Sequence, residues 1–252
     1  MTENSIFRGA ATALITPLTA DGIDYESFGR VPMIAGTGSN DIAYGIDLTK
    51  FACEIGYDAV LVVTPYYNKA TQNGLIKSYL ATADASSKPC ILYNVPSRTG
   101  VNIEPATYDI LADHPMIQGI KEANGNIAKI VETMSIVGDR LDLYSGNDDE
   151  IVPLLSVGGS GVISVLSNVF PKETSLMCKK FFEGDTKGAL ELQFKYFKLI
   201  KALFSEVNPI PVKAAMAAMG FCEDYLRLPL TPMEDAHKEV LLQCMREQGL
   251  NV

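Results

Sequence analysis

The feature that most constrains the fold is a repeated alternation of short apolar runs with longer amphipathic segments. The apolar runs are nearly continuous, as expected for strands of a sheet that is covered on both faces. They are Ala11–Thr16, Pro32–Ala35, Ala59–Val63, Ile91–Tyr93, Ile117–Lys121, Leu141–Tyr144 and Gly161–Val165. The helical patterns between them are Ile42–Ile55, Gly74–Ala85, Pro105–Ala112, Ile127–Val137, Glu150–Val157 and Lys172–Phe182. Strand followed by helix, repeated this often, predicts an α/β protein of the TIM-type (β/α) barrel class.

The last quarter of the chain has only helical patterns. They are Lys187–Phe204, Pro211–Met219 and Met233–Gln248. A break at Asn208-Pro209-Ile210-Pro211 separates the first two, because proline removes a backbone donor and restricts the residue before it. We therefore expect a barrel domain over residues 1–184 and a C-terminal helical region over residues 185–252.

The first crossover is unusually short. The first strand ends near Leu18 and the next begins near Pro32, with a turn and the short segment Tyr25–Arg30 between them. A parallel crossover with its helix needs at least about ten to twelve residues. With seven predicted strands where a standard barrel has eight, this spacing predicts that one βα unit is missing near residue 30.

Composition excludes several classes of protein. Of 252 residues, 47% are hydrophobic, which is enough for a large core, and the net charge of −9 disfavours a nucleic-acid partner. We expect neither a membrane span nor a secretory signal. The five cysteines form no C-x-x-C pair and indicate a reducing, cytoplasmic compartment. His114 and His237 lack the spacing of a zinc site, so we expect no metal.

The residues that end the strands are the candidates for chemistry, since barrel enzymes carry their active sites there. Lys121 ends the fifth strand, where burial favours the neutral, nucleophilic amine that forms a Schiff base with a ketone. Tyr93 ends the fourth strand and could relay protons, and Arg98 follows in a loop where it could bind a carboxylate. Position alone favours a solvated lysine, a packing tyrosine and a turn arginine over these chemical roles.

Other polar or aromatic segments are weaker signals. Tyr66 and Tyr67 follow the third strand and are typical of interface anchors, although simple packing would also explain them. Asn40 or Asp41, after the glycine-containing loop that starts at Gly36, is best explained as a helix cap. Asp148, with Asp149 and Glu150, is favoured at a helix N-terminus by the helix dipole rather than as a metal cluster.

Eight segments together resemble the dihydrodipicolinate synthase family of the pyruvate-dependent class I aldolases, in the family's order and over nearly the whole chain. They are Ala11–Pro17, Val31–Asn40, Thr64–Asn68, Tyr93–Gly100, Gly119–Asn124, Ser145–Asp148, Gly161–Val165 and Asn208–Lys213. Several motifs in order are far more specific than any one of them. By this resemblance Lys121 forms the Schiff base with pyruvate, Tyr93 exchanges protons there, and Tyr67 completes a relay in a neighbouring subunit.

The resemblance also implies the substrate-binding residues and the reaction. Arg98 would hold the carboxylate of aspartate semialdehyde, and the main chain near Ile163 and Gly146 would line the pyruvate pocket. The implied activity is condensation of pyruvate with aspartate semialdehyde for lysine and diaminopimelate biosynthesis, without any cofactor, in a homo-oligomer that is a dimer or a tetramer. Two alternatives stay open: another aldolase of the superfamily, or a non-catalytic paralogue.

One departure from the family pattern bears on activity. The family carries a G-T-T-G-E type loop after its second strand, and its threonines bind the pyruvate carboxylate and link the two tyrosines. No such loop is found here, which implies the loss of roughly 40 residues, about one βαβ crossover. We therefore expect an impaired carboxylate site and relay and an incomplete lysine feedback site, unless Thr37 has taken over the lost threonine's role.

Overall fold

The fold is described from a computed structural model of the chain, which describes residues 5–14, 18–19, 22–23 and 32–252. It has two compact units. The first comprises Met1–Arg8 and Arg30–Val162, and the second comprises Gly9–Gly29 and Ile163–Val252. The predicted boundary between residues 184 and 185 stays a prediction.

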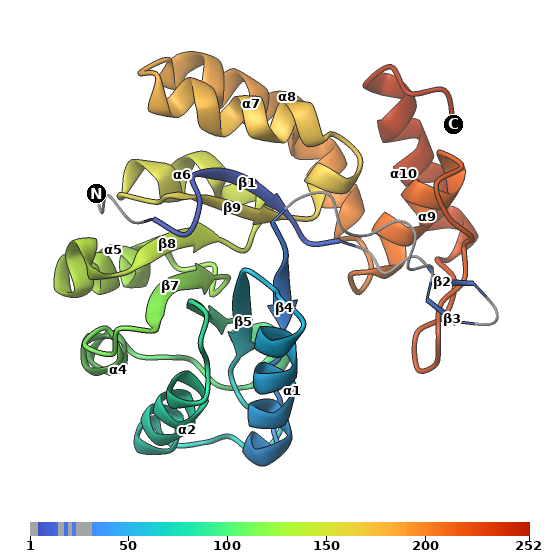
Figure 1. The fold of residues 1–252 in the computed structure, drawn as a ribbon. Helices are drawn as coiled ribbons and strands as arrows, with labels where there is room; N and C mark the ends of the chain where they lie inside the picture. Colours follow the sequence, from blue (N-terminus) through green and yellow to red (C-terminus); the bar gives the residue numbers. More distant parts are fainter. Residues whose placement is uncertain (1–4, 15–17, 20–21, 24–31) are drawn as a thin grey trace. The chain divides into compact units, whose positions relative to one another are not determined.

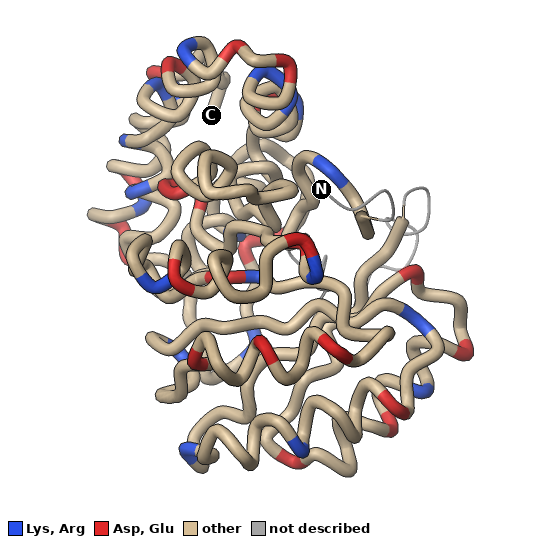
Figure 2. Tube along the Cα trace, turned by 90° about the vertical axis from the view of Figure 1, so that its left-hand side faces the viewer, with Lys and Arg blue, Asp and Glu red and all other residues tan. Residues whose placement is uncertain are grey.

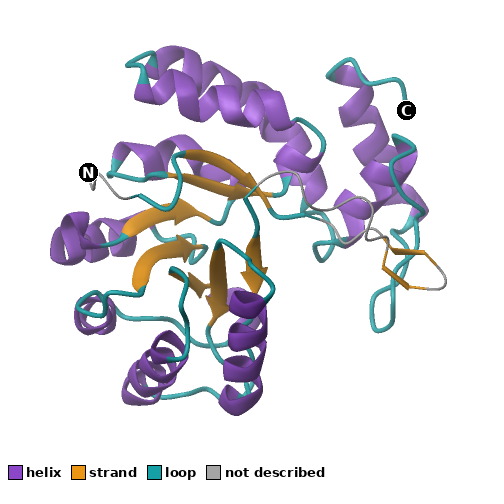
Figure 3. Ribbon diagram, in the orientation of Figure 1, coloured by secondary structure: helices purple, strands orange, loops and turns teal. Residues whose placement is uncertain are grey.

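The first unit is built on a parallel sheet whose strands lie side by side in chain order (Figure 1). The strands are β4 (Ile34–Gly36), β5 (Ala59–Val63), β6 (Cys90–Asn94), β7 (Ile117–Glu122), β8 (Asp142–Ser145) and the start of β9 (Gly161–Ser164). The helices that connect them are α1 (Ile42–Glu54), α2 (Gln72–Asp84), α3 (Pro96–Thr99), α4 (Pro105–Leu111), α5 (Ile127–Val137) and α6 (Ile151–Ser156). The predicted parallel α/β arrangement is confirmed, and the sheet curls (Figure 3).

The strands alternate in what they present to the two faces of the sheet. Leu92, Ile120 and Leu143 belong to the buried core shared with the helices. The intervening residues Tyr93 and Lys121 lie in register on β6 and β7, and Lys121 is in register with Tyr144 on β8. Since successive side chains of a strand point to opposite faces, these three residues face away from the helices. One face of the sheet thus packs against the helices, and the other carries Tyr93 and Lys121 beside apolar residues such as Ile91.

The N-terminal segment belongs to the first unit and covers the beginning of β8. The Phe7 ring stacks on Tyr144, with ring centroids 4.2 Å apart and planes 14° apart. The Tyr144 hydroxyl donates to the Phe7 carbonyl at 2.9 Å. At the other end of the sheet, α1 begins at the predicted cap: the Asp41 carboxylate accepts from the Ala43 and Tyr44 N–H groups.

The second unit consists of β1 (Gly9–Thr12) beside β9, a two-stranded antiparallel pair and a set of helices. The pair is β2 (Leu18–Thr19) and β3 (Gly22–Ile23), and the helices are α7 (Pro171–Phe182), α8 (Thr186–Leu203), α9 (Ile210–Ala218) and α10 (Asp235–Glu247). The C-terminal helices agree with the sequence patterns. They enclose a second apolar core that includes Tyr196, Leu199 and Leu241.

The missing βα unit predicted near residue 30 lies outside the described residues and stays a prediction. The closed barrel stays a prediction as well. Within the described residues, no helix combines the length and the apolar character that a membrane crossing requires. Lys and Arg are interspersed with Asp and Glu along the trace (Figure 2).

Candidate active site

Lys121 is a buried lysine near the carboxyl end of β7. Its side chain is only 6% exposed, and its ammonium nitrogen lies 4.1 Å from the centroid of the Tyr93 ring. The pKa of Lys121 is lowered to about 8, chiefly by burial; the negative charge of Asp148 opposes this shift and the positive charge of Arg98 adds to it. A substantial neutral fraction at mild pH makes this amine a nucleophile.

Tyr93 is the neighbour of Lys121 on β6. Burial raises the pKa of its hydroxyl, the charge of Arg98 lowers it, and the charge of Glu122 raises it. The phenol is therefore protonated at neutral pH and available as a proton donor. A tyrosine and an amine in this arrangement can transfer a proton at the carbon that the amine binds.

The backbone of Gly146, which follows β8, passes close to the Lys121 side chain. Its N–H donates to the Glu122 carbonyl at 2.7 Å. A Cβ at this position would lie 2.8 Å from the Ala123 Cβ and 3.2 Å from the Lys121 Cε. Gly146 is thus a position where the backbone passes so close to the lysine that no side chain fits.

Arg98 lies on the single-turn helix α3, in the loop that follows β6. Its side chain is exposed, and its charge acts on both Tyr93 and Lys121. The turn ends at Gly100, whose φ of +73° is left-handed. An exposed guanidinium near a buried amine can receive the carboxylate of a substrate that enters from solvent.

Tyr67 stands in the loop after β5 and is 89% exposed. Its φ of +75° is unusual for a side chain of this size, and its N–H donates to the Thr99 carbonyl at 3.3 Å. The strained backbone directs the ring outward instead of into its own unit. This exposure fits the predicted reach into another subunit, which stays a prediction.

Comparison with known proteins assigns the chain to a family. The sequence profile of the dihydrodipicolinate synthetase family matches residues 8–248. The chain belongs to this family. The resemblance stated from its motifs is thereby confirmed.

Its relatives in this family include 4-hydroxy-tetrahydrodipicolinate synthases of bacteria. The enzyme of Caldicellulosiruptor bescii is 51% identical over 293 aligned positions, which cover 98% of this chain and 99% of the relative. That of Alkaliphilus oremlandii is 52% identical over 222 residues, 88% of this chain and 77% of the relative.

Solved structures of the family have the same fold. The dihydrodipicolinate synthase of Thermotoga maritima superimposes with a TM-score of 0.93 at 38% identity, and 97% of this chain and 99% of that one are covered. A monomeric dihydrodipicolinate synthase variant gives a TM-score of 0.94 at 38% identity, with 98% of each chain covered. This chain is therefore an enzyme of the TIM-type α/β class.

Four of the six residues predicted from the family pattern belong together in the first unit around one lysine. Lys121, Tyr93 and Gly146 are in direct proximity, and Arg98 acts on the first two through its charge. Tyr67 belongs to the same unit but points outward. Ile163 belongs to the second unit, so its predicted part in the pyruvate pocket stays a prediction.

Thr37 does not take the place of the family's loop threonines. Its hydroxyl accepts from the Thr49 hydroxyl of α1 at 2.8 Å, and its side chain is buried with residues of α1 and α2. Thr37 therefore faces the helices, on the opposite side of the sheet from Lys121. The Thr37 hydroxyl therefore stabilises the packing of α1 against the sheet and is not available to replace a threonine of the family's loop.

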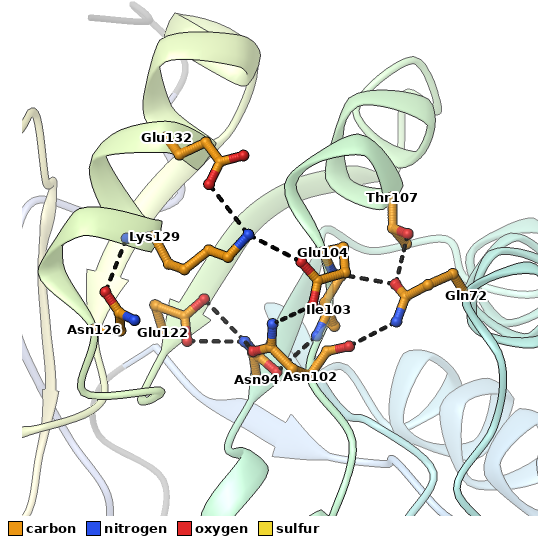
Figure 4. A network of polar contacts seen from close by, with 10 residues as sticks. All are labelled: Gln72, Asn94, Asn102, Ile103, Glu104, Thr107, Glu122, Asn126, Lys129 and Glu132. Carbon is orange, nitrogen blue, oxygen red and sulfur yellow. Dashed lines mark hydrogen bonds and ion pairs between the residues drawn. The ribbon is translucent and has the colours of Figure 1, made fainter.

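Two acidic residues near Lys121 were not predicted to have a part in the site. Asp148 lies at the start of a short 3₁₀ turn, Asp148–Glu150, where the helix dipole favours it as expected, but it is also buried and its charge acts on Lys121. Glu122 follows Lys121 directly, is 2% exposed and is bonded through Asn94 to a polar network (Figure 4). A carboxylate inside an otherwise apolar strand pattern was the available signal.

Proposed function

We propose that this chain condenses pyruvate with L-aspartate 4-semialdehyde to give 4-hydroxy-tetrahydrodipicolinate, through a Schiff base on Lys121. The observation that carries the proposal is the buried amine of Lys121, 4.1 Å from the Tyr93 ring centroid and with a pKa lowered to about 8. The names of the family relatives support the same reaction. This reaction would serve lysine and diaminopimelate biosynthesis, and we expect the enzyme to act in the cytoplasm.

The first half of the reaction activates pyruvate. The neutral Lys121 amine adds to the ketone carbon, and loss of one water leaves a protonated imine between the lysine nitrogen and that carbon. The imine withdraws electrons, so a proton can leave the methyl carbon and an enamine forms. Tyr93, whose ring lies beside the Lys121 nitrogen, is the group that we assign to proton exchange at this centre.

The second half joins the aldehyde. The enamine carbon attacks the aldehyde carbon of the second substrate, and the substrate's own amine then displaces the lysine nitrogen to close the ring. Arg98 would hold the carboxylate of this substrate. Tyr67, exposed on its loop, would complete the proton relay of a neighbouring subunit, which requires a homo-oligomer of two or four chains.

Reductive trapping tests the first half. The protein is incubated with pyruvate and borohydride, and the adduct is located by peptide mass spectrometry. We expect it on Lys121 and expect none in Lys121→Arg, which keeps the charge but cannot form the imine. Absence of an adduct in folded wild-type protein would overturn the proposal and favour the non-catalytic paralogue.

Turnover tests the second half. Wild-type protein and Tyr93→Phe are compared in the condensation of pyruvate with aspartate semialdehyde. Removing the phenol while keeping the ring should lower kcat by about 10²- to 10⁴-fold, the range for loss of a general acid–base group. Trapping without condensation, together with turnover of a different aldehyde, would favour another aldolase of the superfamily.

A further inference from the structure

We propose that Glu122 is a positioning residue for the aldehyde half of the reaction, because it orients Asn94 and Asn94 closes the loop that carries Arg98. The inference rests on the proposed function. The proposed role needs no contact of Glu122 with pyruvate or with the Lys121 side chain, and it is separate from the effect of the Glu122 charge on the pKa of Tyr93. Its effect passes through the backbone of the loop at residues 95–103.

Glu122 is a fully enclosed acceptor at the end of β7. Both its carboxylate oxygens lie within reach of the Asn94 amide nitrogen, at 3.0 and 3.1 Å. The Asn124 N–H donates to the same carboxylate at 2.9 Å, and the Tyr108 hydroxyl of α4 donates at 3.2 Å. A buried carboxylate with this many donors is held in one orientation, since losing any of them leaves a polar group unsatisfied.

Asn94 links Glu122 to the far end of the loop at residues 95–103. Its amide nitrogen also donates to the Asn102 side-chain oxygen at 2.8 Å, and its own side-chain oxygen accepts from the Ile103 N–H at 3.1 Å. The last residue before the loop is thereby bonded to the two residues that end it. Arg98 lies between these tied ends.

The end of the loop has further support from outside (Figure 4). The Asn102 carbonyl accepts from the Gln72 amide at 2.8 Å, and the Glu104 N–H donates back to Gln72 at 3.1 Å. Lys129 of α5 forms an ion pair with Glu104 at 3.2 Å. These bonds fix Asn102 and Glu104 on the helix side, and the Asn94 side chain is what ties that end of the loop to the end of β6.

The orientation of the Asn94 amide is decided by Glu122. The ionised carboxylate, which predominates above pH 7, only accepts, so it requires the amide nitrogen of Asn94 to face it, and the amide oxygen is then turned to the Ile103 N–H. Glutamine at position 122 would offer one acceptor and one donor group. Its NH₂ would face the Asn94 NH₂ in either orientation, because that nitrogen lies 3.0 and 3.1 Å from the two oxygen positions, whereas the Tyr108 hydroxyl could turn and accept. The Asn94 amide would lose its single favoured orientation.

The pyruvate half is separated from this network by the sheet. Glu122 and Lys121 are consecutive on β7, so their side chains point to opposite faces. Lys121 contacts the Tyr93 ring on one face, whereas Glu122 contacts α4 on the other. A change at Glu122 should therefore alter aldehyde binding more than imine formation.

The test compares Glu122→Gln with wild type and with Arg98→Lys in the condensation assay and in borohydride trapping. We expect KM for aspartate semialdehyde to rise about tenfold in Glu122→Gln, with KM for pyruvate and the trapping rate within twofold of wild type. In the double variant Glu122→Gln/Arg98→Lys, the two increases should not multiply, because both act on the same contact.

Asp142→Asn is the matched control, since it makes the same chemical change in a buried carboxylate. Asp142 begins β8, whereas Glu122 ends the neighbouring strand β7, so the two carboxylates lie at opposite ends of the strands. Asp142 accepts from Ser5, from the Ile6 N–H and from Ser160. This variant should lose stability but keep KM for the aldehyde. If Glu122→Gln does not fold, Asn102→Ala serves instead: it cuts the bond from Asn94 at the far end of the loop and should raise the same KM.

The outcomes separate the inference from the proposed function. Wild-type protein that forms no pyruvate adduct would overturn the function and the inference together. An active wild type with an unchanged aldehyde KM in Glu122→Gln would overturn the inference alone. So would equal losses in trapping and in aldehyde KM, because they would show a general structural defect.

Discussion

Lys121 lies in register with Tyr93 on the neighbouring strand, and the lysine nitrogen is 4.1 Å from the centroid of the tyrosine ring. The ring shields the amine from water on that side. A ring face attracts a cation, but the cost of burying the charge is larger here, since the pKa of Lys121 falls to about 8 instead of rising. The same pair thus provides a nucleophile and a proton donor.

The pH dependence of trapping should report this pKa. Below pH 8 the neutral fraction of Lys121 grows about tenfold per pH unit, and above it the amine is mostly neutral. We expect the rate of adduct formation with pyruvate to rise with a slope near one up to about pH 8 and then to level off. A rate at Lys121 that keeps rising with the same slope well above pH 8 would contradict the lowered pKa.

Gly146→Ala should damage the site through space alone. The added methyl group would lie 3.2 Å from the Lys121 Cε and 2.8 Å from the Ala123 Cβ, so the lysine or the backbone must move. We expect a loss of about 1–3 kcal/mol in the free energy of unfolding and a fall of about tenfold or more in the trapping rate. Gly36→Ala, at a strand end where a Cβ meets nothing within 4 Å, is the control and should trap normally.

Thr37→Val should affect stability and not chemistry. It removes a buried hydroxyl that pairs with Thr49, while Thr49 keeps its bond to the Gly45 carbonyl at 2.9 Å. The free energy of unfolding should fall by about 1 kcal/mol in denaturant titrations. The trapping rate should stay within twofold of wild type. A tenfold slower rate in an equally stable protein would show that Thr37 serves pyruvate after all.

The free energy of unfolding should depend on pH because of the raised pKa of Glu122. Burial raises the pKa of this carboxyl to about 7 from an ordinary 4.5, so the folded state binds a proton that the unfolded state has lost between those pH values. The stabilisation relative to Glu122→Gln is therefore complete below pH 4.5 and is lost as pH rises through 7, by at most about 3 kcal/mol. Urea titrations of both proteins at pH 5 and pH 8 measure the difference. A gap that widens in favour of wild type at pH 8 would have the wrong sign.

The sequence predicted the sheet well because its strands are buried on both faces. Ala59–Val63 has the predicted bounds, and Ile117–Glu122 extends the prediction by one residue. Continuous apolar runs carry this information locally, and the caps at Asp41 and Asn126 limit the helices that follow. The antiparallel pair β2 and β3 was missed, since each strand has only two residues.

The site was less predictable from the residues alone. Position did not decide whether Lys121 was solvated or buried, and only the family motifs favoured the Schiff base. The link from Asn94 to Asn102 and Ile103 joins residues eight and nine positions apart across an irregular loop, so no periodicity predicts it. The role of Glu122 follows from strand alternation only once Tyr108 of α4 is known to lie behind it.

The tie between Asn94 and the end of the loop also makes residues 95–101 an exchangeable cassette. Its two stems are bonded to each other and to Glu122, on the face of the sheet away from Lys121. New sequences that keep a positive charge at position 98 could be inserted between these stems to accept other aldehydes, while Lys121 and Tyr93 keep their places on the strands. Selection for a different product could therefore proceed in one short segment, with little risk to the step that every aldehyde shares.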